Sequence, residues 1–221
     1  MRRPLMQSVF NRPQVSSRVL GTALMVGALV ATLAALLLPV QLFGASTPAA
    51  AAGPKWDNDG GGTVNTPSGP LSALDRDFVR KVRLAGMWEQ PAGRMAVERG
   101  TTTAVRTAGM HLIHGHAELN QLDIADARQL GITLPTTPTV QQQGWLHQIQ
   151  GAHGAQFDRT FAQLVRFAHG KVFALIAAVR DRTENSVVRA LATRANAVVL
   201  DHITVVENTG LVDFHALPTT K

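Results

Sequence analysis

The sequence of 221 residues contains no cysteine and no tyrosine, and it has only three tryptophans. The absence of cysteine excludes disulfides, thiolate metal sites and cysteine nucleophiles, so packing alone must stabilise the fold. Nucleic-acid-binding surfaces are typically basic stripes interleaved with aromatic residues, and no stretch of this sequence has that composition. We therefore expect no nucleic-acid partner.

Excess positive charge is confined to the N-terminus. The formal net charge is +6, but four of the 21 basic residues, Arg2, Arg3, Arg12 and Arg18, precede residue 19. The remaining 17 basic residues nearly balance the 15 acidic ones, so the rest of the chain is almost neutral. The charge thus gives no evidence for a polyanionic partner.

Residues 19–38 form an unbroken run of uncharged, mostly apolar residues. As a helix this run extends about 30 Å, enough to cross the hydrocarbon core of a bilayer. Its basic flank stays in the cytoplasm by the positive-inside rule, so the chain beyond it is predicted to be extracytoplasmic. We assign residues 1–18 to a basic cytoplasmic region and 19–43 to a transmembrane or signal segment, with the membrane as its partner.

Two fates of this segment remain open. Its length favours a retained anchor, because signal-peptide cores have about 7 to 15 apolar residues. The alanines at 49–52 offer several A-x-A cleavage sites, which favours secretion after cleavage. Residues 44–71, rich in Ala, Gly and Pro, are predicted to be a flexible linker, and residues 72–217 the folded domain.

The apolar pattern of the folded domain has the period of helices and no convincing alternation typical of strands. Capping residues, glycines and prolines mark where the helices begin and end. Short links make two antiparallel hairpins, so the expected fold is an all-α four-helix bundle. The expected helices are Ser72 to Gly100, Thr102 to Leu130, a short piece at Trp145 to Gln150, Ala155 to Asp181, and a last helix capped by Thr183 or Asn185 that continues to about His215.

Each long helix has a polar, metal-competent residue within its apolar stripe. Glu89 lies in the first stripe, His116 and Asp123 in the second, His169 at the edge of the third and His202 in the fourth. Counted from the two hairpin turns, Glu89, His116, His169 and His202 all fall near the middle of the bundle. The side chains of these four residues could therefore converge in its interior.

Two interpretations of these four residues remain open. Imidazole and carboxylate donors suit Zn, Fe, Cu or Mn, and helix bundles build such sites from facing helices. Glu89, His116, His169 and His202 are therefore candidate ligands of a transition metal whose identity the sequence does not give. The alternative is a metal-free structural or protein-interaction module in which neutral core histidines are hydrogen-bonded, for example to Glu89 or Asp123.

Catalytic residues are not predicted. After Ser72 the only serine is Ser186, which fits a cap of the last helix better than a nucleophile. The di-iron signature Glu-x-x-His is missing, since Ile113, Arg166 and Val199 precede the three histidines by three residues, and this argues against oxygen-activating di-iron chemistry. The sequence favours no enzymatic activity, and it gives neither a protein partner nor an oligomeric state.

Short motifs in the folded part resemble a known family. They are Asp75-Arg76-Asp77-Phe78-Val79, His116-Ala117-Glu118-Leu119-Asn120, Phe157-Asp158-Arg159 followed by His169, and finally His202. In order and spacing they resemble the exported bacterial proteins of the domain of unknown function 4142 family, over residues 74–217.

The resemblance implies a ferritin-like four-helix bundle behind an N-terminal export segment, with no established activity. It also implies that His116, His169 and His202 are the family's core histidines and that Glu89 is its glutamate. Pro91 departs from the family pattern, and a proline inside a helix is expected to kink it and to redirect Glu89.

Overall fold

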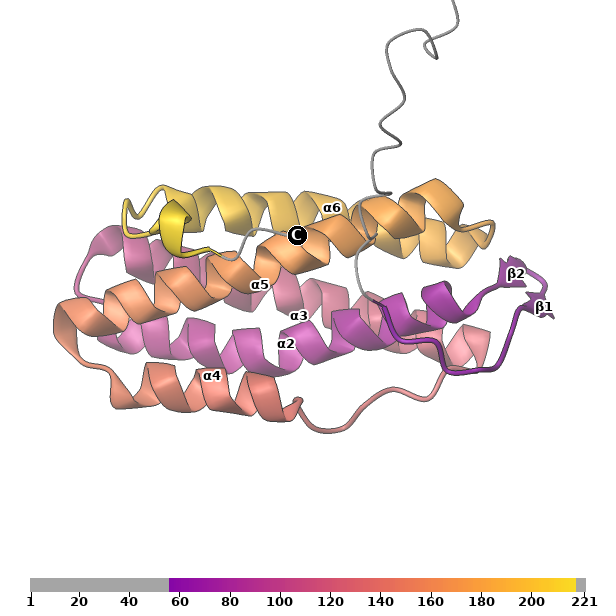
Figure 1. Cartoon of the computed structure of the whole chain (residues 1–221), viewed down its shortest axis with the longest axis horizontal. Coiled ribbons are helices and arrows are strands. Elements are labelled where there is room, and N and C mark those ends of the chain that lie inside the picture. The colour runs from indigo at the N-terminus through magenta and orange to yellow at the C-terminus, as the bar shows by residue number, and fades with distance from the viewer. Residues whose placement is uncertain (1–55, 218–221) are drawn as a thin grey trace, which may run out of the picture. The chain divides into compact units, whose positions relative to one another are not determined.

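The computed structural model describes residues 56–217, so the predictions for the N-terminal and apolar segments lie outside the described residues. Within this range five α-helices dominate, accompanied by one small hairpin and a short 3-10 helix (Figure 1). In chain order the elements are β1 (Val64–Thr66), β2 (Gly69–Leu71), α2 (Ala73–Arg99), α3 (Thr103–Leu130), α4 (Val140–Gly151), α5 (Gly154–Arg182), α6 (Ser186–Glu207) and η2 (Phe214–Ala216).

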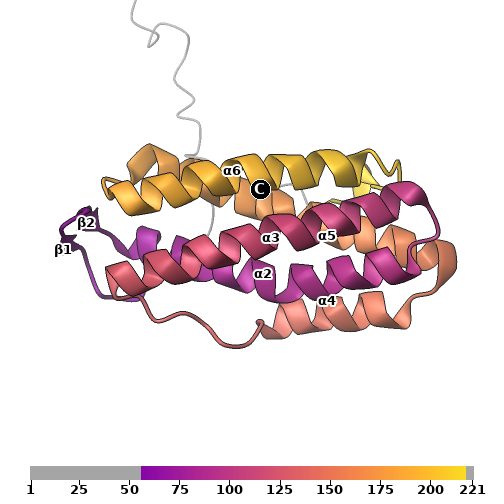
Figure 2. The same cartoon turned by 180° about the vertical axis from the view of Figure 1, so that it is seen from behind.

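The four long helices form a bundle. Helix α2 lies beside α3 and α5, and α6 lies beside the same two helices (Figures 1 and 2). The predicted all-helical bundle is therefore confirmed. By length and composition α5 could also cross a membrane, but here its buried side chains, among them Phe161 and Ile176, pack inside the bundle.

Helix α4 returns the chain along the outside of the bundle, against α2 and α5. Arg99 at the end of α2 donates to the carbonyls of Gln150 and Ala152 at the end of α4, so both helices finish at the same end. Thr101 donates its backbone N–H to Asp158 in the first turns of α5. Because α5 begins where α2 ends, α3 and α5 run in the same direction, and neighbouring long helices are antiparallel.

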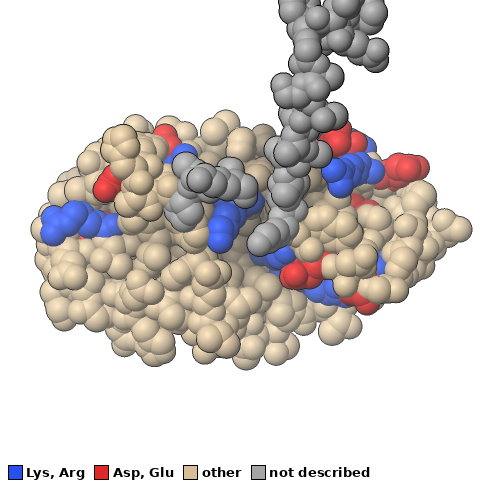
Figure 3. Space-filling view, viewed as in Figure 1, with Lys and Arg blue, Asp and Glu red and all other residues tan. Residues whose placement is uncertain are grey.

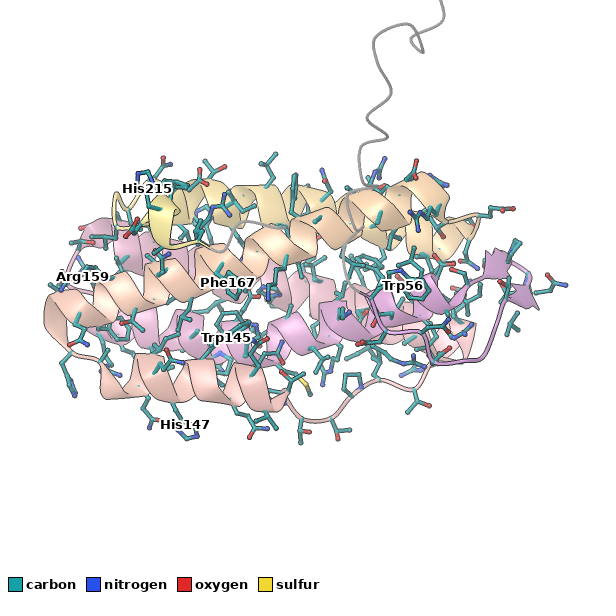
Figure 4. All side chains as sticks on the ribbon, viewed as in Figure 1. Trp56, Trp145, His147, Arg159, Phe167 and His215 are labelled. Atoms are coloured by element: carbon teal, nitrogen blue, oxygen red, sulfur yellow. The ribbon has the colours of Figure 1, made fainter. Side chains whose placement is uncertain are left out.

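Trp145 attaches α4 to the bundle. Its ring centroid lies 5.0 Å from that of Trp88 and 6.0 Å from that of Phe167, in edge-on arrangements that aromatic pairs prefer. Figure 4 shows Trp145 and Phe167 on facing sides of α4 and α5, while His147 points away from the bundle.

The helix ends follow the capping signals of the sequence. Ser72 and Asp75 form the reciprocal capping box at the start of α2. Gly131 ends α3 in the left-handed conformation, with a φ of 68°, as the C-terminal glycine predicts. Of the two candidate caps of α6, Asn185 is the one whose side chain accepts the first free backbone N–H groups.

Two helix boundaries differ from the prediction. Helix α6 ends at Glu207 and does not continue to His215, because the chain turns through Gly210, whose φ is 69°, and Asp213 then caps η2. Helix α4 begins at Val140, earlier than Trp145. Thr139 and Gln142 form a capping box there, a signal that the apolar pattern alone does not reveal.

The hairpin β1–β2 lies within the stretch predicted to be linker, with Val64 opposite Leu71. Asp59 accepts hydrogen bonds from Arg76, at 2.8 Å to Nε, and from Arg80, at 3.0 Å to Nη1. Trp56 also packs against the core. The folded domain therefore begins before residue 72, because residues 56–71 pack against the bundle.

Buried apolar side chains form two cores along the bundle axis. The core nearer the hairpin includes Phe78 and Leu119, and the core nearer α4 includes Trp88 and Phe161. On α3, α5 and α6 a buried histidine lies between the two sets, and on α2 the buried Glu89 directly follows Trp88, the first residue of the second set. On the surface, the face in Figure 3 shows scattered acidic and basic side chains without a broad area of one sign, in keeping with the near-neutral composition.

Candidate metal centre

The stretch between the two cores contains a cluster of four buried polar side chains, here called the Glu-His cluster. Glu89 comes from α2, His116 from α3, His169 from α5 and His202 from α6. Their exposed fractions are 1–3 %. One ligand atom from each residue lies within 4.8 Å of those from the other three. The structure thus brings together all four residues that the sequence singled out as candidate ligands.

The carboxylate of Glu89 bridges two of the rings. Its Oε2 atom lies 2.7 Å from His116 Nε2 and 3.2 Å from His169 Nε2. His169 Nε2 in turn lies 3.0 Å from His202 Nδ1. These contacts link the four helices through their side chains at the centre of the bundle.

Backbone carbonyls fix the tautomers of two rings. His169 Nδ1 lies 2.9 Å from the carbonyl oxygen of Val165, and His202 Nε2 lies 3.0 Å from that of His111. A carbonyl oxygen can only accept, so each of these nitrogens must carry the hydrogen. If both rings are neutral, the other nitrogens, His169 Nε2 and His202 Nδ1, carry no hydrogen. Their lone pairs then face each other.

This arrangement fits a metal ion. Metal-ligating histidines typically donate their second ring N–H to a carbonyl or carboxylate, as His169 and His202 do here. A tetrahedral site with bonds of about 2.1 Å separates its donor atoms by about 3.4 Å. Three donor pairs of the Glu-His cluster are 2.7–3.2 Å apart, and all four donors lie within 4.8 Å of one another, so small shifts of the side chains would accommodate an ion.

Gly115 on α3 makes room for the ring of His202. A Cβ atom on Gly115 would lie 2.5 Å from His202 Nε2, so this position tolerates no side chain while His202 reaches the His111 carbonyl. A Cβ atom on Gly86 would lie in ordinary contact, 3.7 Å from His116 Nδ1. Gly115 could not be singled out from the sequence, because a glycine inside a helix gives no indication of which side chain approaches it.

Pro91 does not redirect Glu89. Helix α2 continues through Pro91 to Arg99, and the Glu89 side chain is 3 % exposed and lies within the cluster. The expectation that the proline would aim Glu89 elsewhere is therefore wrong. Glu89 lies before the proline, so its direction is set by the turns of α2 that precede the missing N–H.

Burial disfavours charge on every member of the cluster. It raises the pKa of Glu89 above its usual range, although the adjacent His169 ring opposes this. Burial also lowers the pKa of His116, His169 and His202. Histidines that are held neutral keep a lone pair for a metal, and a bound cation would favour the ionised form of Glu89.

Asp123 does not join the cluster. It is completely buried, and among the described residues neither of its carboxylate oxygens has a hydrogen-bond partner. The metal-free arrangement in which a core histidine pairs with Asp123 is therefore not observed. His116 Nδ1 is likewise buried without a partner in this part of the chain.

The other polar residues of α3 lie on its outer face. The ring of His111 is 40 % exposed and pairs with Asp201, at 2.7 Å. Glu118 forms a two-pronged ion pair with Arg194, with both contacts at 2.5 Å. These pairs join α3 to α6 at the surface and contribute no side chain to the cluster.

Fold and site together define an all-α bundle protein with a buried centre of three histidines and one glutamate. The chain belongs to the family described as Domain of unknown function (DUF4142), which matches residues 62–209. The match includes the hairpin and all five α-helices, and it ends before η2. No curated protein shows significant similarity to the chain. No solved structure does so either.

Proposed function

We propose that this protein binds one transition-metal ion through the Glu-His cluster: Glu89, His116, His169 and His202. The observation that carries the proposal is the contact between His169 Nε2 and His202 Nδ1. These two nitrogen atoms are 3.0 Å apart, and both are acceptors when the rings are neutral. Two acceptors this close repel each other in a dry interior unless a cation or an additional proton lies between them. An additional proton is disfavoured, because burial lowers the pKa of both rings.

The donor set selects the kind of ion. Three imidazole nitrogens and one carboxylate oxygen suit Zn, Fe, Cu or Mn, whereas Mg and Ca prefer oxygen ligands. Four donors are enough for one ion. A di-iron site would need a Glu-x-x-His motif on two helices, so we expect a single ion. When bound, the ion would supply Lewis acidity or redox chemistry, while the protein residues would hold it and shield it from bulk solvent.

We further propose that the bundle is ferritin-like. The crossover through α4 supports this, because ferritin-like folds join two antiparallel hairpins by one long connection. The parallel course of α3 and α5 follows from that connection, and the site lies between facing helices as in metal-binding bundles of this type.

Export of the domain is part of the proposal. Its support is the apolar run at residues 19–38 behind a basic N-terminus, which the sequence pattern assigns to a membrane anchor or a secretion signal. A site of histidines and a carboxylate contains no thiol, so its donors would not be oxidised to disulfides outside the cytoplasm.

Metal analysis of the purified full-length protein tests the proposal. After dialysis against metal-free buffer, the wild-type protein should retain about one equivalent of a transition metal, as expected of four protein donors. The double substitution His116→Ala and His202→Ala should abolish retention, with the helical circular dichroism preserved. His147→Ala is the matched control, because His147 lies on the outer side of α4 (Figure 4).

Equal metal content in the wild-type protein and the double variant would contradict the proposal. The metal-free alternative, a structural or interaction module with a hydrogen-bonded polar core, would then remain.

A further inference from the structure

A small cavity adjoins the Glu-His cluster on the side of the hairpin. Its volume is about 20 Å³, and three cluster members, Glu89, His116 and His169, lie at one end of its lining. Apart from Lys81, the rest of the lining is apolar and comes from all four long helices. His202 does not line it, since its ring packs toward the backbone of α3 at His111 and Gly115.

Lys81 separates this cavity from solvent. Its side chain lines both the cavity and an open surface cleft beside Asp77 and Arg80. The side chain is 28 % exposed, and Nζ donates to Asp77 at 2.8 Å. Asp57 also lies 3.6 Å from Nζ. A flexible lysine held by ion pairs at the surface can swing away more readily than a packed apolar side chain. Movement of the Lys81 side chain would therefore connect the cavity with the surface cleft.

We infer that the metal centre offers a fifth coordination position on the side of this cavity, in addition to its four protein donors, and that this position binds one neutral molecule of one or two heavy atoms. The inference rests on the proposed metal binding. The side follows from the lining, because three ligands border the cavity, whereas the fourth, His202, does not line it and lies against the backbone of α3.

Size and polarity of the cavity define the ligand class. A void needs about 10 to 15 Å³ to hold one water molecule, whereas pockets for organic ligands measure about 300 Å³ or more. The cavity of about 20 Å³ thus admits a single small molecule. An anion would lose its hydration against apolar walls, so a neutral ligand is favoured.

Nitric oxide binding to the iron(II)-loaded, full-length protein tests the inference under anaerobic conditions. Iron content is measured first on the same sample, and the paramagnetic iron–nitrosyl adduct is then recorded by electron paramagnetic resonance. We expect an adduct with nitric oxide, and prior addition of azide, which is charged and also has three heavy atoms, should not diminish its signal. Methyl isocyanide, a neutral ligand with three heavy atoms, should be excluded by size.

Two substitutions change the cavity in opposite directions. Ala195→Val fills part of the lining and should weaken nitric oxide binding about tenfold or more at unchanged iron content. Val199→Ala enlarges the cavity and should admit methyl isocyanide. Val198→Ala is the matched control, because Val198 is a buried neighbour on α6 that does not line the cavity, and it should keep the wild-type ligand profile.

The outcomes distinguish failure of metal binding from failure of ligand binding at the cavity. Bound iron without a nitric oxide adduct would overturn the fifth position and leave metal binding intact. A nitric oxide signal diminished by azide, or identical ligand profiles for Val199→Ala and Val198→Ala, would overturn the role of the cavity. Failure to retain iron or any other transition metal would overturn the proposed function, and this inference with it.

Discussion

His169 Nε2 and His202 Nδ1 face each other at 3.0 Å, while the second nitrogen of each ring donates to a backbone carbonyl. An ordinary buried histidine places one nitrogen against a donor and the other against an acceptor, and so needs no further partner. His169 and His202 do not have this arrangement when both rings are neutral, because each ring then presents an acceptor to the other. The relationship therefore distinguishes the Glu-His cluster from a group of core histidines that are merely hydrogen-bonded.

Gly115→Ala is predicted to destroy the site without altering a ligand. The new Cβ would lie 2.5 Å from His202 Nε2 and would displace the ring from the His111 carbonyl. We expect metal retention after dialysis to be lost and the urea midpoint to fall, although alanine is intrinsically favoured over glycine in a helix by about 1 kcal/mol.

Gly144→Ala on α4 is the control for this substitution. Nothing lies within 4 Å of the position where its Cβ would be, so only the gain in helix propensity remains. This variant should keep the metal and be more stable by about 0.5 to 1 kcal/mol. Equal behaviour of the two variants would show that His202 does not need the space above Gly115.

Asp123→Asn is predicted to stabilise the protein in a pH-dependent manner. Burial raises the pKa of Asp123 to about 8, the nearby Asp126 adds to this, and Arg83 opposes it. In the unfolded chain the carboxyl has a pKa of about 3.9. Between these values only the folded state binds the proton, so the wild-type free energy of unfolding falls as pH rises from about 4 to about 8.

Asparagine stays neutral throughout this range, so the variant should gain on the wild type over the same interval, by roughly 1 kcal/mol or more, and level off above it. Urea unfolding of metal-free protein at several pH values measures the difference. Asp181→Asn, at an exposed position, should show no such trend. A stability difference independent of pH would mean that Asp123 is ionised in the folded protein.

Asp59→Ala is predicted to release the segment that precedes α2. Asp59 receives hydrogen bonds from Arg76 and Arg80, and these contacts hold the pKa of its carboxyl well below its usual range. Limited proteolysis should then cut within residues 56–71 faster than in the wild type, while the bundle resists. Asp57→Ala is the control, because that side chain is 90 % exposed. Identical digestion of both variants would exclude a role of Asp59 in attaching the segment.

Export is predicted to depend on the apolar run. A C-terminal fusion to a reporter enzyme that is active only outside the cytoplasm should be active with the full chain and inactive when residues 19–38 are deleted. The complementary fusion, to a reporter active only inside the cytoplasm, should give the reverse pattern. Activity of the cytoplasmic reporter in the full-length fusion would refute the extracytoplasmic assignment.

The positions of the four cluster residues could be inferred from the sequence, because polar residues that interrupt an apolar stripe at helical spacing must face the interior. Helix ends marked by Ser72 and Gly131 were equally accessible, since capping chemistry is local. The contacts of His169 and His202 with backbone carbonyls were not accessible, because every residue has a carbonyl and only packing selects the one that is used.

The remaining differences also have tertiary causes. The end of α6 at Glu207 depends on Gly210 taking a left-handed conformation, whereas the apolar pattern continues to Val212. The hairpin near Val64 is too short to produce an alternating pattern, and its place depends on contacts such as that of Asp59 with Arg76. Such contacts join residues far apart in the chain and cannot be predicted from the local composition.

The division of the Glu-His cluster between the two helical hairpins has a mechanical consequence. Glu89 and His116 belong to the α2–α3 hairpin, and His169 and His202 to the α5–α6 hairpin. Along the chain, the connection that contains α4 joins these two helical hairpins. An ion bound by two residues of each would act as a removable crosslink, so the loaded bundle would open as one unit and the empty bundle could part along the plane between its hairpins.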